Sequence, residues 1–289
     1  MDYLILGASG VLGSRLMEVL CRTHSVIGTY NTHAFPDGLH CDLGSEQSVK
    51  NLLSNVQPRV LIHVAGMTRT EECESSPDEA YVVNVDGIRH ILSYFRGHKL
   101  VFFSTDSVFD GESAPYDEDS QPAPVNVYGA TKVQAEKSLL QAAPYSLVVR
   151  VAGLYGWSKL NREFLSRIRQ SSPLVCSTDH FSSYTWMDDI CRLLSSLEPM
   201  TGVVHLVGPG RYSRAEFTQL ACRFLALQGE VRSVKGLEAY TGASRKRGST
   251  LVSLRLRTTL TPAPNALRKL HDRLHEEVNL AGYGGNVNG

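Results

Sequence analysis

The chain has 289 residues, with 29 basic and 29 acidic side chains, so its formal net charge at neutral pH is zero. A chain of this length can bury a sizeable core in one large domain, or in a domain that carries a smaller second lobe. The balanced charge provides no overall basic field that would attract nucleic acid, and there is no acidic tail.

The cysteines and the apolar runs point to a reduced, soluble protein. The six cysteines form no CxxC pair, which argues against a zinc ribbon and favours reduced thiols in a cytosolic protein. The N-terminus has no basic, signal-like stretch, and no apolar run approaches the ~20 residues of a membrane span. We therefore expect a cytoplasmic protein with no membrane partner and no nucleic-acid partner.

Short apolar runs alternate with helical patterns through the first half of the chain. The runs are continuously apolar, which is typical of strands buried on both faces of a parallel sheet. Alternating strands and helices predict right-handed βαβ units and a doubly wound α/β fold. The expected strands are residues 3–6, 25–29, 59–64, 100–104 and 146–151, and the expected helices are 11–21, 46–53, 78–95 and 128–141.

Beyond about residue 151 the pattern loosens. We expect a helix near 161–169, an irregular stretch at 176–185, a helix from Met187, a strand at 203–206 and a helix from Ser213. The region from Gly229 onwards is poorly patterned, and the glycine-rich end is typical of a flexible tail. His271 and His275 are four residues apart on a further predicted helix, but no third ligand accompanies them, so we predict no metal site.

A glycine-rich loop joins the first strand to the first helix. The stretch GASGVLG has the form GxxGxxG, in which glycine allows a sharp turn and lets backbone N–H groups approach a pyrophosphate. The alternative is a tight strand–helix turn without a ligand, but the position between a strand and a helix favours a dinucleotide. The predicted cofactor contacts in this loop are Gly7, Ser9, Gly10, Val11, Leu12 and Gly13.

The end of the second strand bears on the choice of cofactor. NAD sites usually carry an acidic residue there for the ribose 2′-hydroxyl, whereas this stretch reads GTYNTH. Without a carboxylate a 2′-phosphate is not repelled, which favours NADP(H) and places Tyr30 and Asn31 against the cofactor. No arginine follows at once, so NAD(H) stays open.

Tyr128 and Lys132 are four residues apart and share one face of a predicted helix, a spacing that packing alone can explain. Chemistry offers a second interpretation, because hydride transfer to a ketone produces an alkoxide that needs a proton. A cation about 4 Å from a tyrosine is worth roughly 4 kcal/mol at an effective dielectric constant of ~20, or about three pKa units. Lys132 would then lower the pKa of Tyr128 towards neutrality, with Thr105 at the end of the preceding strand holding the carbonyl.

The glycine loop, Thr105 and the Tyr128-x-x-x-Lys132 motif together resemble the extended short-chain dehydrogenase/reductase family. Within it, the stretch STDSVFDG and the run from Pro122 to Glu136 resemble the dTDP-4-dehydrorhamnose reductase subfamily. The resemblance implies a Rossmann-type doubly wound parallel sheet with a smaller C-terminal substrate lobe. It implies that Thr105, Tyr128 and Lys132 are catalytic, and that Lys132 also hydrogen-bonds the nicotinamide ribose.

The resemblance also assigns cofactor and substrate positions. Asp42 and Leu43 are expected at the adenine, and Asn84 lies on the helix behind the site, where packing or capping is an equal alternative. Ser107 and Gly153 stand where the subfamily usually has an aromatic residue and a tryptophan, so the substrate pocket is altered. The remaining cofactor positions are Ala65, Gly66 and Thr68, and the predicted substrate residues are Thr105, Asp106, Gly153 and Asn161, with Trp157, Phe164, the stretch 179–181, Arg245 and Arg247 as further candidates.

These patterns predict a division of the chain and two alternative functions. Residues 1–150 form the NAD(P)-binding domain, 151–280 are mainly a substrate lobe whose segment at about 187–206 returns to the sheet, and 281–289 are a tail. The first hypothesis is an NADP(H)-dependent reductase of a nucleotide-linked 4-keto-6-deoxy sugar, as a possible homodimer. The alternative is a non-catalytic NADP-binding subunit resembling the regulatory beta subunit of methionine adenosyltransferase. An epimerase or dehydratase is weaker, because no glutamate follows Asp106.

Overall fold

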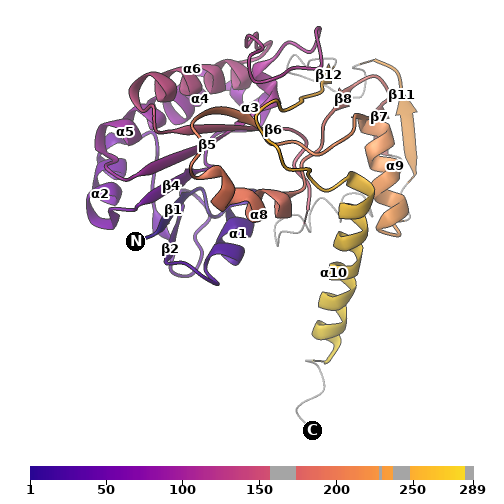
Figure 1. Ribbon diagram of the computed structural model, residues 1–289, viewed down its shortest axis with the longest axis horizontal. Helices are drawn as coiled ribbons and strands as arrows, with labels where there is room; N and C mark the ends of the chain where they lie inside the picture. The colour runs from indigo at the N-terminus through magenta and orange to yellow at the C-terminus, as the bar shows by residue number, and fades with distance from the viewer. Residues whose placement is uncertain (157–173, 228–229, 237–247, 284–289) are drawn as a thin grey trace.

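A seven-stranded parallel sheet forms the centre of the computed structural model, which describes residues 1–156, 174–227, 230–236 and 248–283 (Figure 1). The strand order is β3-β2-β1-β4-β5-β6-β9, and every neighbouring pair is parallel. The strands are β1 (Tyr3–Leu6), β2 (Val26–Tyr30), β3 (Leu39–His40), β4 (Val60–His63), β5 (Lys99–Thr105), β6 (Leu147–Val151) and β9 (Gly202–His205). The predicted doubly wound parallel sheet is confirmed.

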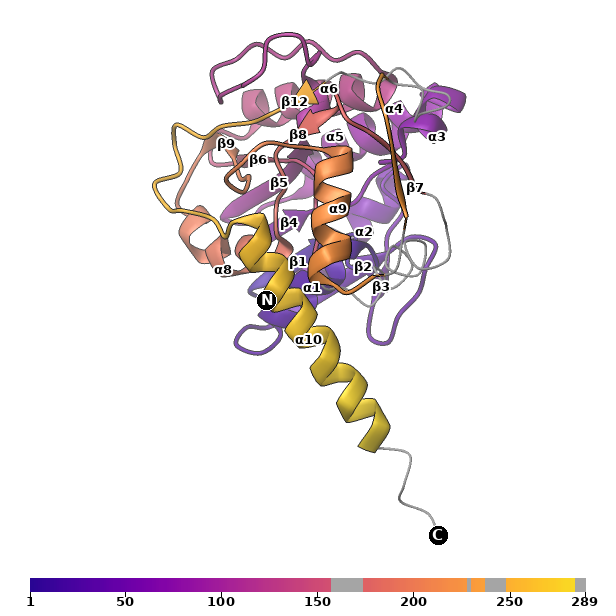
Figure 2. The same ribbon diagram turned by 90° about the vertical axis from the view of Figure 1, so that its right-hand side faces the viewer.

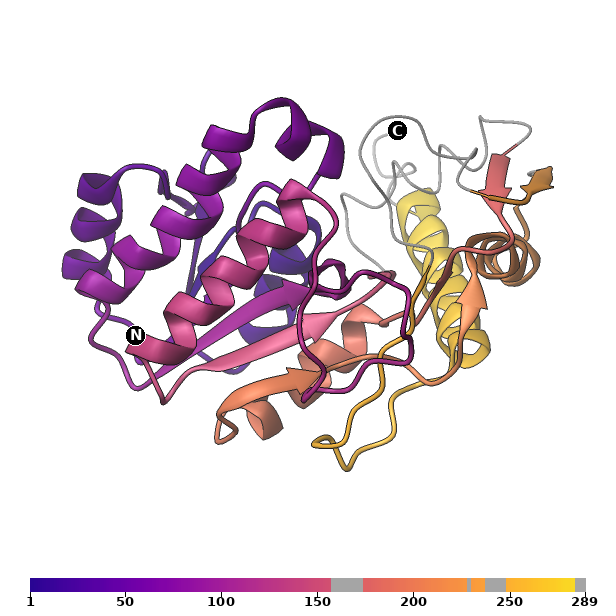
Figure 3. The same ribbon diagram turned by 90° about the horizontal axis from the view of Figure 1, so that it is seen from above.

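Helices cover both faces of this sheet (Figures 1 and 3). On one face α1 (Val11–Leu20) and α8 (Met187–Leu197) bury their apolar sides against alternate residues of the strands. On the other face α2 (Glu46–Val56), α5 (Gly87–Tyr94) and α6 (Val127–Ala142) pack on the intervening residues. Because both faces are covered, the central strands are mainly apolar on both sides, which is the pattern seen in the sequence.

The strand order reverses between β1 and β4, which leave the centre of the sheet in opposite directions along the order. Ile5 of β1 lies beside Gly28 of β2 on one side and beside Ile62 of β4 on the other. The loops that follow these strands therefore separate and leave a crevice at the carboxyl ends, which is where open α/β sheets bind ligands.

The helix expected over residues 78–95 is interrupted. It consists of α4 (Pro77–Tyr81), a π-helical turn at Val82–Asp86 and α5, with the short α3 (Thr70–Ser75) before it. A π-helical turn inserts one extra residue into a helix and changes where its side chains point. Here the turn contains Asn84, whose buried side chain contacts the loop after β4.

The C-terminal part lies beyond the carboxyl end of the sheet (Figures 1 and 2). The stretch expected to be irregular contains the end of β7 (Leu174–Ser177) and β8 (Phe181–Ser182), because strands from later in the chain pair with it. The helix predicted near 161–169 lies outside the described residues, and α10 continues through 281–283, into the predicted tail. The other elements are β10 (Tyr212–Ser213), α9 (Arg214–Phe224), β11 (Val231–Val234), β12 (Gly248–Ser249) and α10 (Ala263–Tyr283).

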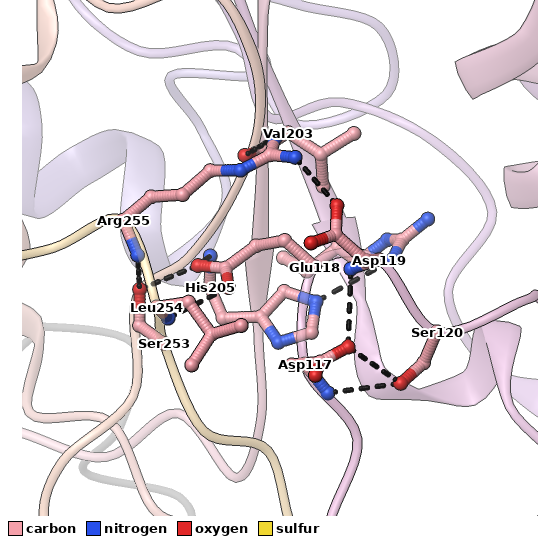
Figure 4. Close-up of polar contacts among 10 residues, drawn as sticks. Asp117, Glu118, Asp119, Ser120, Val203, His205, Ser253, Leu254 and Arg255 are labelled. Atoms are coloured by element: carbon pink, nitrogen blue, oxygen red, sulfur yellow. Dashed lines mark hydrogen bonds and ion pairs between the residues drawn. The ribbon is translucent and has the colours of Figure 1, made fainter.

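A segment of residues 248–256, which we call the strap, crosses back to the sheet. It is held by Glu118, whose buried carboxylate accepts hydrogen bonds from the backbone N–H groups of Leu254 and His205, at 2.8 and 2.9 Å, and from the Ser253 hydroxyl (Figure 4). Arg255 adds an exposed ion pair with Asp119 at 2.8 Å. The strap is therefore fixed to β9 and to the loop before α6.

Behind the strap lies a buried polar chain that reaches helix α6. The Nδ1–H of His205 donates to the carbonyl oxygen of Val252 at 2.9 Å, which leaves Nε2 to accept from Arg150 at 3.4 Å. Arg150 on β6 forms an ion pair with Glu136 of α6 at 2.7 Å, and both side chains are about 4% exposed. Burial and the Arg150 charge lower the pKa of His205, consistent with a neutral ring.

No helix in the described part of the chain combines the length and the apolar character needed to cross a membrane.

Candidate active site

A cavity of about 750 Å³ occupies the crevice at the carboxyl ends of β1, β2, β4, β5 and β6. One end is formed by the glycine loop and the residues after β2. The other end is formed by the end of β5, the start of α6 and the loop after β6. A cavity lined by both groups of residues at a topological switch point matches the position of a dinucleotide site.

The glycine loop is shaped by close backbone approaches. Gly7 has φ +87°, and a Cβ there would lie 2.8 Å from the backbone nitrogen of Ala65. A Cβ on Gly13 would lie 2.1 Å from the carbonyl oxygen of Gly7, so this glycine packs α1 against the loop. The N–H of Gly10 donates to the same carbonyl at 3.0 Å, and α1 begins at the next residue. The resulting backbone cradle, with the positive end of a helix behind it, fits a pyrophosphate.

The wall after β2 carries no acidic side chain. Tyr30, Asn31 and Thr32 line the cavity here, as the sequence predicted for the first two. Arg69, which follows Thr68 directly, also lines the cavity and pairs with Glu72 at 2.8 Å. The sequence analysis did not predict this cation, because Arg69 follows β4 and not β2. Its position next to Thr68, a predicted cofactor residue, is the feature of the sequence that could have indicated it.

Asn84 supports the cavity wall from behind. Its Oδ1 accepts from the Met67 N–H at 2.9 Å, and its Nδ2 donates to the Met67 carbonyl at 3.0 Å and to Thr131 at 3.0 Å. These bonds use its polar atoms on protein partners and tie the loop after β4 to α6. Asn84 does not line the cavity in the structure, so these bonds favour a positioning role, and the predicted cofactor contact stays a prediction.

The start of α6 brings Tyr128 to Thr105. The side chain of Asn126 caps the helix by accepting from the Gly129 N–H at 2.8 Å. A Cβ on Gly129 would lie 2.2 Å from the carbonyl oxygen of Ser107, so only glycine allows this approach. Tyr128, in the first turn, shares a hydrogen bond with Thr105. Two residues far apart in the sequence thus meet at the end of the cavity.

The pKa of Tyr128 is raised above its ordinary value. Burial is the main cause, and the hydrogen bond with Thr105 lowers the value while the nearby Asp106 carboxylate raises it. The structure therefore does not show the lowering by Lys132 that we expected. In this arrangement the ammonium group of Lys132 is hydrogen-bonded to the backbone carbonyl oxygen of Phe103.

Lys132 lies one helical turn after Tyr128, and its side chain packs against β5, an interior strand of the sheet. Its Nζ donates to the carbonyl oxygen of Phe103 at 2.8 Å and lies 3.9 Å from the ring centroid of Phe102. Burial lowers the pKa of Lys132 to about 7, against a raising effect of Glu136 one turn further along α6. The lysine can therefore change its charge near neutral pH.

The carboxylate of Asp106 accepts hydrogen bonds from hydroxyl groups of three segments. Its Oδ1 accepts from Thr105 at 3.2 Å, and its Oδ2 accepts from Ser182 of β8 at 3.5 Å and from Ser249 of the strap. The strap thus reaches the candidate site directly. The carboxylate lies at the border between the main cavity and a smaller one beside it.

Most of the predicted site residues line the main cavity, but Gly13, Asp42 and Asn84 do not. The Asp42 carboxylate accepts from the Gly44 N–H at 2.9 Å in a local turn, and its neighbours Cys41 and Leu43 line the cavity wall. Asn161, Trp157, Phe164, Arg245 and Arg247 lie outside the described residues. The predicted residues that line the cavity are Gly7, Ser9, Gly10, Val11, Leu12, Tyr30, Asn31, Leu43, Ala65, Gly66, Thr68, Thr105, Asp106, Tyr128, Lys132 and Gly153.

The sheet, the glycine cradle and the tyrosine–lysine pair define a dinucleotide-binding protein of the doubly wound α/β class. The family model described as RmlD substrate binding domain matches residues 1–279, and the chain belongs to this family. The resemblance to extended short-chain dehydrogenase/reductases of the dTDP-4-dehydrorhamnose reductase type is therefore confirmed.

Three known proteins illustrate the relationship. The chain is 27% identical over 288 residues to methionine adenosyltransferase 2 subunit beta of Danio rerio, covering 92% of this chain and 88% of the relative. It is 29% identical over 260 residues to dTDP-4-keto-6-deoxy-D-glucose reductase of Streptomyces niveus, covering 86% and 88%. A crystal structure of dTDP-4-dehydrorhamnose reductase from Bacillus anthracis str. Ames in complex with NADP shares the fold with a TM-score of 0.81 at 24% identity, over 94% of this chain and 99% of the other.

Proposed function

We propose that the protein is an NADP(H)-dependent reductase of a keto group on a nucleotide-linked 4-keto-6-deoxy sugar. The observation that carries the proposal is the single cavity that has a phosphate cradle at Gly7 and a hydrogen-bonded Thr105–Tyr128 pair at its other end. The named reductase of Streptomyces niveus supports the substrate class, and the NADP complex of the Bacillus anthracis protein supports the cofactor.

The residues of the cavity fit a dinucleotide. The backbone of Gly7–Leu12 would hold the pyrophosphate, and Tyr30, Asn31 and Thr32 form a wall without a carboxylate, which suits a 2′-phosphate. NAD(H) remains possible because no basic side chain from the end of β2 lines that wall. When bound, the reduced nicotinamide supplies the hydride.

Tyr128 and Thr105 act on the carbonyl oxygen. Tyr128 transfers its hydroxyl proton to the oxygen as the carbon accepts the hydride, so that the ketone becomes an alcohol and the tyrosine becomes a phenolate. Thr105 donates a hydrogen bond to the same oxygen, and the phenolate recovers a proton from water. The charge of Lys132, one helical turn away, stabilises the phenolate.

The division of the chain belongs to the same proposal. Residues 1–150 carry the cofactor machinery and 151–280 mainly the substrate contacts, although β9 lies in the central sheet. The homodimer and the cytoplasmic location remain predictions from the sequence. Light scattering of the purified protein at several concentrations tests the homodimer.

Oxidation of NADPH, followed by nicotinamide absorbance, tests the reductase with a panel of dTDP-4-keto-6-deoxy sugars and with both cofactors. We expect turnover with at least one member, and a fall of about a hundredfold or more in kcat for Tyr128→Phe, since a positioned proton donor contributes about 10²–10⁴. Absence of turnover across the panel, or a Tyr128→Phe variant as active as the parent, would refute the reductase.

A second candidate function follows from the relationship to methionine adenosyltransferase 2 subunit beta. In this case the cavity would bind NADP without turnover, and the protein would act by binding a methionine adenosyltransferase catalytic subunit. Lys132 bonds the Phe103 carbonyl oxygen and the pKa of Tyr128 is raised, two observations that favour this alternative. Co-elution of the two proteins, together with cofactor binding that never leads to NADPH oxidation, would support it.

A further inference from the structure

Three cavities of the protein meet at one glycine. Gly153, in the loop after β6, lines the main cavity, a polar side pocket of about 160 Å³ and an apolar pocket of about 250 Å³. The polar side pocket is lined by side chains that include Asp106, Asn126, His180, Ser182, Tyr184 and Arg214. Gly153 and Asp106 each line both the main cavity and this pocket, so a molecule that extends from the reactive end of the main cavity into the pocket lies beside them.

The ring of Tyr184 occupies the space where a side chain on residue 153 would lie. A Cβ on Gly153 would be 2.6 Å from Cδ1 of Tyr184 and 3.1 Å from the carbonyl oxygen of Ser183. Gly153 also has φ +50°, in the region that side chains disfavour. A larger residue at 153 would therefore push the tyrosine ring aside.

Tyr184 is held firmly in this position. Its ring stacks on Phe217 with centroids 3.6 Å apart and planes 2° apart, and Tyr155 meets the same phenylalanine edge-on at 5.0 Å. The flanking backbone is bonded on both sides, since the Tyr184 carbonyl accepts from Gly208 at 3.1 Å and the next N–H donates to Ala152 at 3.0 Å. The ring is a rigid aromatic surface at a cavity wall.

The chemistry of the polar side pocket combines one aromatic side chain with several hydrogen-bonding groups. Carboxylate, amide, hydroxyl and guanidinium groups can bond the hydroxyls of a compact ring, while an aromatic face packs against its C–H groups. Asp106 lines this pocket and also the main cavity, which Thr105 and Tyr128 line too, so a ring seated there lies next to the end of the main cavity that holds the proposed proton donor.

We propose that Tyr184 is a specificity-determining residue, forming with Gly153 the wall that packs against the sugar ring of the substrate. This inference rests on the proposed function for the identity of the ligand. It assigns the sugar selectivity to a side chain from the segment before α8 and not to the loop after β6. The pocket keeps an aromatic wall although residue 153 has no side chain, because the ring of Tyr184 fills that space.

Calorimetric titrations of the NADP⁺-saturated protein with dTDP-rhamnose and with dTDP test this wall, because their affinity ratio isolates the sugar. One aromatic contact is worth about 0.5–1.5 kcal/mol, so we expect Tyr184→Leu to reduce that ratio about two- to twelvefold. Gly153→Ala should reduce it similarly by displacing the ring, while Tyr184→Phe should retain most of it. Tyr145→Leu, at an exposed tyrosine far from the cavities, is the matched control.

Thermal unfolding and NADPH binding of each variant show that it is folded. A wild-type protein that binds dTDP-rhamnose no more tightly than dTDP would overturn the proposal. So would Tyr184→Leu and Gly153→Ala variants that leave the ratio unchanged. Sugar-dependent binding that responds to both variants without NADPH oxidation would sustain the Tyr184 wall and refute only the reductase.

Discussion

The ammonium group of Lys132 donates a hydrogen bond to the backbone carbonyl oxygen of Phe103 at 2.8 Å. Its helical neighbour Tyr128 is bonded instead to Thr105, and burial moves the two pKa values in opposite directions. The lysine is easier to deprotonate than in water and the tyrosine is harder to deprotonate. The proposed mechanism requires the charge of Lys132 to stabilise the Tyr128 phenolate once that phenolate forms.

The pH dependence of stability should report the buried lysine. Its pKa falls from an ordinary 10.5 to about 7 in the folded protein, so between these values the unfolded chain binds more protons. Stability therefore rises with pH above 7 and is lost as pH falls towards 7. For the cofactor-free protein, the free energy of unfolding should rise by about 2 kcal/mol more from pH 7 to 9 than it does for Lys132→Met. Urea unfolding at a series of pH values measures the free energy of unfolding of both proteins. If that free energy changed equally with pH in the two proteins, the prediction would be contradicted.

Asn84 should control cofactor affinity without touching the cofactor. Asn84→Ala removes the bonds to Met67 and leaves buried backbone groups unpaired, which costs about 1–3 kcal/mol of stability. The loop at 65–68 then loses its fixed position, and we expect the Kd for NADPH to rise about tenfold. Fluorescence titration measures the Kd. The control is Asn51→Ala on the exposed surface of α2, where an equal loss of affinity would show that the effect is not specific to Asn84.

The wall after β2 should set the choice of nicotinamide cofactor. Asn31→Asp adds a carboxylate where a 2′-phosphate would lie, so the ratio of NADPH to NADH affinity should fall by at least about tenfold, because the two like charges would lie at close range. The neutral Asn31→Ser variant should change the ratio much less. Titration of each variant with both cofactors measures it, and equal effects of the two substitutions would show that charge at this wall does not discriminate.

Glu118 should matter far more for stability than its neighbour. Glu118→Gln replaces an acceptor of three hydrogen bonds by an amide whose NH₂ must face a donor, so the cost should be about 1–3 kcal/mol (Figure 4). Asp119→Asn breaks only an exposed ion pair with Arg255, worth less than about 1 kcal/mol. Urea unfolding of the two variants compares them, and similar losses would show that the strap is not anchored through Glu118.

Local patterns were sufficient for the sheet and for the phosphate cradle. The continuous apolar strands and the GxxGxxG spacing depend on residues that are close in the sequence, and both gave the observed elements. The local pattern did not show the π-helical turn at Val82–Asp86, in which Asn84 bonds Met67 from another segment of the chain. The short strands β8 and β12 were not predicted either, because each is formed by pairing with a segment that is distant in the sequence.

The sequence by itself determined the residues that chemistry needs: a glycine loop, a hydroxyl at 105 and a tyrosine and lysine one helical turn apart. Their spacing follows from the helix and from the strand–helix turn, which are local. Only the tertiary structure decided which group the Lys132 ammonium bonds. It alone also decided that the ring of Tyr184 occupies the space beside Gly153. Those outcomes depend on burial and on contacts between segments such as Lys132 with Phe103 and Gly153 with Tyr184, which no local pattern encodes.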